Sequence, residues 1–69
     1  MKLDRCEELQ HGEHLIDKEE GAAYVFQFIQ HIHKNKGITR TVNITPLGTD
    51  NCLYTFPIED FCNRFEVYV

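Results

Sequence analysis

The sequence lacks the hydrophobic segments that would place it in a membrane or direct it out of the cell. No apolar run approaches the roughly 20 residues that a membrane-spanning helix needs. The N-terminal stretch MKLDRCEELQ has no apolar core of the kind found in signal peptides. We therefore expect a protein of the cytoplasm that has no membrane partner.

Signatures of catalysis are also missing. The chain contains no GxSxG, P-loop or HExxH motif, and no cysteine carries the local pattern of an activated nucleophile. A chain of 69 residues also leaves little room for a closed cleft. We expect a protein that is not an enzyme and that needs no cofactor.

Cysteine is scarce and widely spaced. Cys6, Cys52 and Cys62 are an odd number and include no CxxC pair. This pattern disfavours the disulfide scaffold of a small secreted protein. We expect the three thiols to be reduced and at least two of them to be buried.

Positive charge is in short supply. Seven Lys and Arg residues stand against eleven Asp and Glu residues, which gives a formal charge of −4. The whole excess lies in residues 1–20, with seven acidic and three basic side chains. This balance argues against direct nucleic-acid binding, which needs positive surface, and suits docking on a basic protein.

Residues 17–37, DKEEGAAYVFQFIQHIHKNKG, carry several signals of an amphipathic helix. Asp17 and Glu20 match a capping box, while Lys34, Lys36 and Gly37 suit a helix C-terminus. At the helical repeat, one face collects the apolar side chains Ala22, Val25, Phe26, Ile29 and Ile32. The pattern predicts a single central helix of about five turns.

The rest of the chain alternates between apolar and polar residues or shows short helical spacing. The alternation predicts strands at 38–45, 52–56 and 65–69, and Pro57 suits the first turn of a short helix. Leu3, Cys6 and Leu9 predict a short helix within residues 1–10, with a strand at 1–6 as the alternative. Residues 11–16 are expected to be a connection.

Together these elements predict one small two-layer α+β domain spanning 1–69, with an acidic N-terminal segment (1–16), a central helix (17–37) and a β-rich half (38–69). The long helix is expected to pack on a three-stranded antiparallel sheet. The predicted core consists of Ala22, Val25, Phe26, Ile29, Ile32, Val42, Ile44, Tyr54 or Phe56, Phe61, Phe65 and Val67.

Cys6, His11 and His14 form the one group near the N-terminus that resembles a set of metal ligands. A zinc site would need a fourth ligand such as Cys52 or Cys62, and the spacing matches no structural zinc pattern. Solvated loop histidines are the simpler interpretation, so no metal is predicted.

Lys34, Lys36 and Arg40 form the only basic cluster. The cluster could contact phosphates or an acidic partner, or it could simply neutralise the end of the predicted helix.

The last predicted strand, FEVYV, is apolar and carries one charge. At a sheet edge it would invite pairing with another chain and hence a homo-oligomer, such as a homodimer. A central position in the sheet is the alternative.

We predict a small acidic, non-catalytic protein-binding module. In a narrower form it is an inhibitor or accessory subunit of a nucleic-acid-handling protein, with carboxylates that mimic phosphates. The candidate protein-binding residues are Asp4, Glu7, Glu8, Glu13, Leu53 and Tyr68. The alternative is a small metal-dependent or nucleic-acid-binding regulator that uses Cys6, His11 and His14 or the patch from Lys34 to Arg40.

Overall fold

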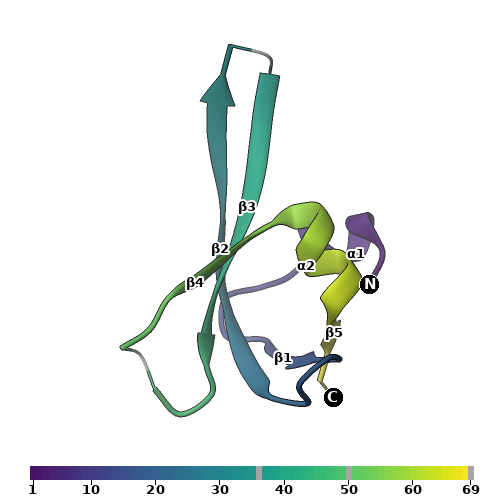
Figure 1. The fold of residues 1–69 in the computed structure, drawn as a ribbon, viewed down its shortest axis with the longest axis vertical. Helices are drawn as coiled ribbons and strands as arrows, with labels where there is room; N and C mark the ends of the chain where they lie inside the picture. The colour runs from purple at the N-terminus through teal and green to yellow at the C-terminus, as the bar shows by residue number, and fades with distance from the viewer. Residues whose placement is uncertain (36, 50, 69) are drawn as a thin grey trace.

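The computed structural model describes residues 1–35, 37–49 and 51–68, which form a five-stranded antiparallel sheet and two short helices. In chain order the elements are α1 (Leu3–Glu7), β1 (His14–Asp17), β2 (Ala23–Lys34), β3 (Gly37–Pro46), β4 (Tyr54–Pro57), α2 (Ile58–Arg64) and β5 (Phe65–Val67). The strand order across the sheet is β4-β3-β2-β1-β5 (Figure 1). Neither helix of the described residues is long and apolar enough to cross a membrane.

The predicted central helix over 17–37 is wrong. Most of that segment is strand β2, which pairs with β3 from Tyr24 opposite Pro46 to Lys34 opposite Gly37. β2 is rich in aromatic and β-branched residues, which pack well on a pleated surface. Long-range pairing with β3 therefore overrides the local capping signal, because helix propensity is a weak preference. The two-layer arrangement of a long helix on a three-stranded sheet is corrected to a larger sheet.

A β-bulge at Gln27 explains why the segment looked helical. Phe26 lies opposite Ile44 and Phe28 lies opposite Asn43, so Gln27 is an extra residue in β2. Phe26 is 4% exposed whereas Phe28 is 48% exposed. After the bulge the core-facing position falls on Ile29, which packs against the core three residues after Phe26. That spacing is the one a helix would show.

The core lies between the sheet and α2. Its buried residues are Cys6, Leu9, Leu15, Phe26, Val42, Ile44, Ile58, Phe61, Cys62 and Phe65. The sequence prediction was correct for Phe26, Val42, Ile44, Phe61 and Phe65, and for two buried cysteines. It was wrong to leave out Leu15, because residues 11–16 contain the first part of β1.

The two short helices and the later strands lie close to the predicted places. α1 falls within residues 1–10, α2 follows Pro57, and β3, β4 and β5 overlap the three predicted strands. β5 lies at one edge of the sheet, where it pairs with β1 in the described part of the chain. The predicted end of that strand at Val69, and Lys36 of the basic cluster, lie outside the described residues.

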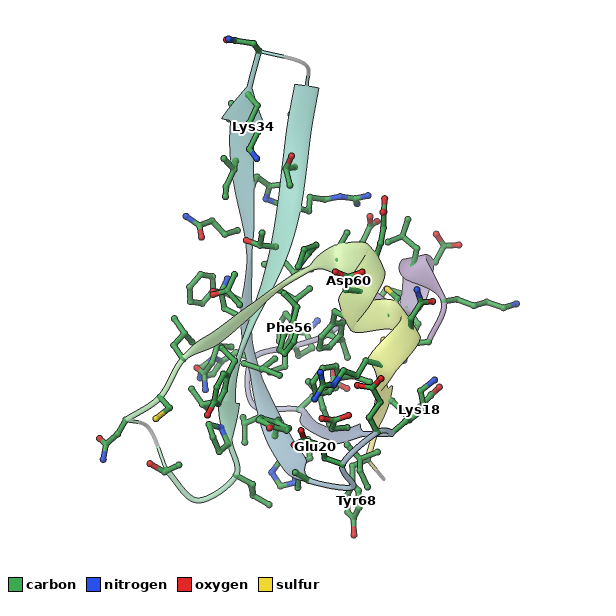
Figure 2. All side chains as sticks on the ribbon, in the orientation of Figure 1. Lys18, Glu20, Lys34, Phe56, Asp60 and Tyr68 are labelled. Carbon is green, nitrogen blue, oxygen red and sulfur yellow. The ribbon has the colours of Figure 1, made fainter. Side chains whose placement is uncertain are left out.

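The hairpin of β2 and β3 is longer than the rest of the sheet. β1 pairs with β2 from Ala23 to Val25, and β4 pairs with β3 from Thr41 to Ile44. Residues 31–34 and 37–40 therefore form a two-stranded extension, here called the distal ribbon, which projects from the body (Figure 1). Lys34 near its tip and Tyr68 lie at opposite ends of the molecule (Figure 2).

Candidate functional site

A bidentate ion pair joins the last residue of β1 to the last residue of α2. Arg64 Nε donates to both carboxylate oxygens of Asp17 at 3.0 Å, and Arg64 Nη2 donates to Oδ2 at 2.7 Å. Asp17 is fully buried, and the Arg64 side chain is 30% exposed. The Arg64 guanidinium also lies 5.7 Å from the centroid of the Phe56 ring. The pair therefore holds the end of α2 on the sheet and fixes the orientation of the arginine.

Hydrogen bonds from Arg64 hold the pKa of Asp17 below its ordinary value, although burial acts in the opposite direction. The backbone N–H of Glu19 also donates to Asp17 Oδ1 at 2.9 Å and stabilises the same carboxylate. In return, Asp17 raises the pKa of Arg64, so both groups stay charged near neutral pH.

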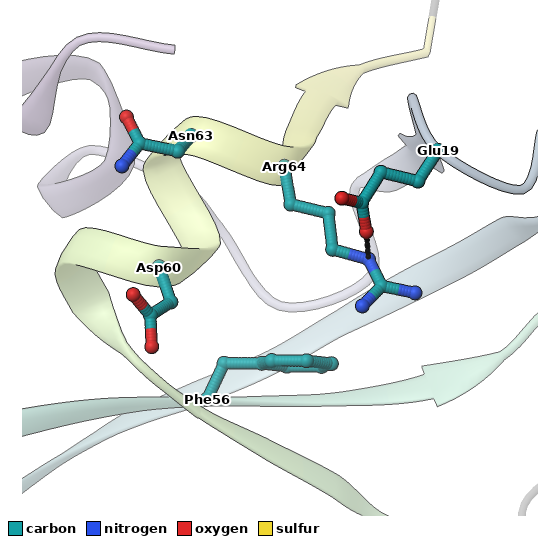
Figure 3. Close-up of a pocket in the computed structure, with 5 residues that line it drawn as sticks. All are labelled: Glu19, Phe56, Asp60, Asn63 and Arg64. Atoms are coloured by element: carbon teal, nitrogen blue, oxygen red, sulfur yellow. Dashed lines mark ion pairs between the residues drawn. The ribbon is translucent and has the colours of Figure 1, made fainter.

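Arg64 forms one wall of an open cleft of about 380 Å³, which is also lined by Glu19, Phe56, Asp60 and Asn63 (Figure 3). Glu19 Oε2 lies 3.1 Å from Arg64 Nε, and Glu20 Oε1 lies 3.5 Å from Arg64 Nη2. We call this feature the Arg64 cleft. Figure 3 shows the Phe56 ring between the Asp60 carboxylate and the guanidinium.

The Arg64 cleft carries an excess of negative charge. One guanidinium serves the three carboxylates of Asp17, Glu19 and Glu20, and Asp60 adds a fourth acid. The Glu19 and Glu20 side chains are 68% and 64% exposed, so their charges face solvent at the cleft rim. Because one guanidinium is surrounded by four carboxylates, the cleft suits a further cation that also packs on the Phe56 ring.

The acidic candidate residues lie mainly on α1 and just after it. Asp4 and Glu8 are exposed, whereas Glu7 forms an ion pair with Arg40 of β3. Glu13 pairs with Arg5 at 3.2 Å, and the backbone N–H of Gln10 donates to the same carboxylate. These hydrogen bonds lower the pKa of Glu13, and the one from Gln10 has the larger effect. Half of this acidic set is therefore neutralised within the chain.

The two apolar candidates do not share a surface with each other. Leu53 immediately precedes β4 and Tyr68 follows β5, and these strands form opposite edges of the sheet. Both side chains are exposed, at 54% and 55%. The six candidate residues therefore do not form one continuous binding surface.

The basic cluster is divided between two surroundings. Arg40 lies at the base of the distal ribbon and pairs with Glu7 of α1. With Ile38 and Ile58, Arg40 also lines a second cleft of about 300 Å³ between β3 and α2. Lys34 lies at the far end of β2. Arg40 therefore has a structural role in fixing the ribbon to the body.

Cys6, His11 and His14 point to different surroundings. Cys6 is fully buried beside Cys62, and burial, followed by the effect of Cys62, raises the pKa of the Cys6 thiol to about 12. His11 is exposed, with Nδ1 at 3.2 Å from the Gln27 carbonyl oxygen, and His14 is exposed on β1. In residues 1–35, 37–49 and 51–68, no group of three His, Cys, Asp or Glu side chains is placed to hold a metal ion.

The sequence reasoning did not identify the Arg64 cleft. Its residues come from the β1–β2 connection, β4 and α2, which only the fold brings together. The available signal was charge: Arg64 is the sole basic residue after Arg40, and the acidic run from Asp17 to Glu20 is an obvious partner for it.

Comparisons of the chain with protein-family models, curated proteins and solved structures found no match.

Proposed function

We propose that the protein is a small non-catalytic binding module that docks on a basic protein and receives an arginine or lysine side chain of that partner in the Arg64 cleft. The observation that supports this most strongly is the composition of the cleft, where the carboxylates of Glu19 and Asp60 line the same open space as the Phe56 ring. Carboxylates attract the cationic head, and the aromatic ring packs on the planar guanidinium or the apolar stem.

The distribution of charge over the chain supports a basic partner. Residues 28–40 contain three basic and no acidic residues. Outside them, the chain has four basic residues against all eleven acidic ones. Such an acidic body increases the rate of encounter with a basic surface, and this effect weakens as salt is added.

In its narrower form the proposal is that the partner handles nucleic acid. A surface that binds phosphates is basic, and a carboxylate-rich module can occupy it as an inhibitor or accessory subunit. The asymmetry of charge is the support for this narrower form.

The test is a titration of ¹⁵N-labelled protein with an oligoarginine peptide, with an oligoglutamate peptide as the control ligand. At low salt, oligoarginine should shift the amide signals of Glu19, Phe56, Asp60, Asn63 and Arg64, and the affinity should fall as salt approaches about 0.15 M. No binding at low salt, or shifts centred on Asp4 of α1 and on Glu8 just after it, would contradict the assignment of the cleft.

A double variant, Glu19→Gln with Asp60→Asn, should weaken the peptide about tenfold, because two partly exposed charge pairs are lost. Asp4→Asn is the matched control, since it removes the charge of an exposed acid on α1 and leaves the Arg64 cleft intact. Equal weakening by Asp4→Asn would show a diffuse electrostatic attraction in place of a site.

A further inference from the structure

The distal ribbon exposes backbone and apolar side chains that the rest of the molecule does not cover. It consists of two strands, and an isolated pair of strands is marginally stable in water. Phe28 at its base and Ile38 within it are 48% and 60% exposed. A third strand would therefore stabilise it.

One side of the ribbon is open to such a strand. The β3 edge faces α2 across the second cleft, which Ile38, Arg40 and Ile58 line. The β2 side faces away from α2 (Figure 1). In the described chain, no strand pairs with residues 28–34 of β2 on that side. A long unpaired edge of this kind is a template for pairing with another strand.

The alternation of an antiparallel ladder identifies the backbone groups on the open side. Every second residue directs its N–H and C=O away from its partner strand. Because Lys34 pairs with Gly37 at the end of the hairpin, the outward residues of β2 are Ile29, His31 and His33. Their side chains lie on the face that carries α2, and those of Phe28 and Ile32 lie on the opposite face.

We propose that residues 28–34 of β2 pair antiparallel with the same residues of a second copy of the chain, about a two-fold axis at His31. In this register His31 lies opposite His31 of the second copy, and Ile29 lies opposite His33 of the second copy. The two ribbons then become one four-stranded sheet. A two-fold interface of this kind closes on itself and gives a dimer.

Charge and side-chain type favour a second copy as the occupant. Lys34 is the only Lys, Arg, Asp or Glu residue in 28–34, and the proposed register places it opposite Phe28, so the two lysines lie at opposite ends of the interface. On the outer face, Phe28 and Ile32 of each copy lie diagonally across from Ile32 of the other. A nearly neutral strand with apolar side chains fits a strand of the same kind better than it fits a polyanion or a charged peptide.

Two measurements on the full chain test the pairing. Sedimentation equilibrium should show a monomer–dimer equilibrium. Residue-resolved amide hydrogen exchange should show protection of Ile29, His31 and His33 that increases with protein concentration, while Gln30 and Ile32 stay protected throughout. A monomer at all concentrations, or fast exchange at the three outward amides in a dimer, would overturn the proposal.

Variants at the two-fold axis separate this interface from the other sheet edges. His31→Pro removes only an outward N–H, which a strand edge tolerates, and it should weaken the dimer about thirtyfold by loss of two symmetric hydrogen bonds. His31→Lys should also weaken the dimer, because it places two positive charges opposite each other.

His14→Lys is the matched control, because it makes the same change at an exposed position on β1. This variant should dimerise like the wild-type chain. A dimer that survives both His31 variants would have to form through the β4 or β5 edge, and the β2 interface would be wrong. Binding of the chain to duplex DNA or to an extended peptide without dimerisation would also overturn it.

Discussion

Asp17 and Arg64, 47 residues apart in the sequence, form a bidentate ion pair with distances of 2.7–3.0 Å. The pair connects β1, which follows the N-terminal segment, to the end of α2. The backbone supports it, because the N–H of Lys18 donates to the Arg64 carbonyl at 2.9 Å. The same arginine shapes the proposed binding cleft, so the stability of the fold and the geometry of the site depend on one contact.

Asp17→Asn should lower the free energy of unfolding by about 2 kcal/mol, because it breaks a charged, buried hydrogen-bond pair. This loss of stability is smaller than for a fully buried ion pair. Arg64 is partly exposed to water, and its ion pairs with Glu19 and Glu20 remain in the variant. Urea denaturation at pH 7 measures it. Glu19→Gln is the control and should cost under about 1 kcal/mol, because that pair is exposed; equal costs would contradict the assigned role of Asp17.

Stability should fall in acid. Arg64 lowers the pKa of Asp17 in the folded protein, and hydrogen bonds from the N-terminal ammonium group and Lys18 lower that of Glu66. As the pH falls, the unfolded chain therefore binds protons at a higher pH than the folded protein does. The stabilisation from Asp17 and Glu66 is complete above their ordinary pKa values of 3.8 and 4.5. It is lost as the pH falls through the lower pKa values that these groups have in the folded protein. Urea denaturation between pH 7 and pH 3 should show the decline, and Asp17→Asn should make it shallower. A flat profile, or greater stability at pH 3, would show the sign to be wrong.

Phe26→Ala and Phe28→Ala should differ sharply although the residues are two apart in one strand. Loss of the buried Phe26 ring should cost about 3 kcal/mol, because it leaves a cavity in the core. Loss of the half-exposed Phe28 ring should cost under about 1 kcal/mol. Urea denaturation of dilute samples makes the comparison. Equal losses would mean that the bulge at Gln27 is absent.

Thiol reactivity should distinguish the three cysteines. Cys52 is exposed, whereas Cys6 and Cys62 are buried side by side, and burial raises the pKa of Cys6 to about 12. Because the thiolate is the reactive form, an aromatic disulfide reagent at pH 8 should titrate one thiol of the folded protein rapidly and all three in urea. Rapid reaction of two or three thiols without denaturant would contradict the buried pair.

The elements after Gly37 could be predicted from the sequence because their signals are local. The alternation along β3, the proline at the start of α2 and the short apolar strand β5 each depend on a few neighbouring residues. β2 could not be predicted in the same way, since Phe26 and Ile29 show helical spacing that the bulge produces in a strand. Asp17 and Glu20 match a capping box, yet both carboxylates approach Arg64.

The candidate site was harder to predict than the fold because it depends on contacts between distant segments. Asp4 and Glu8 are exposed, as expected for an acidic segment. Glu7 and Glu13 instead form ion pairs with Arg40 and Arg5, and the sequence does not reveal these pairs. Charge counts describe the chain as a whole. Which charges remain available to a partner is decided by the pairs that the fold makes.

The most direct test of the account is the pattern of nuclear Overhauser effects within residues 17–45. Paired strands predict strong Hα–Hα contacts between Ile29 and Val42 and between His31 and Arg40, which are the close pairs of this ladder. Hα–HN contacts between residues three apart, running continuously from Asp17 to Lys34, would instead show a helix. That result would contradict the sheet, the Arg64 cleft and the proposed interface together.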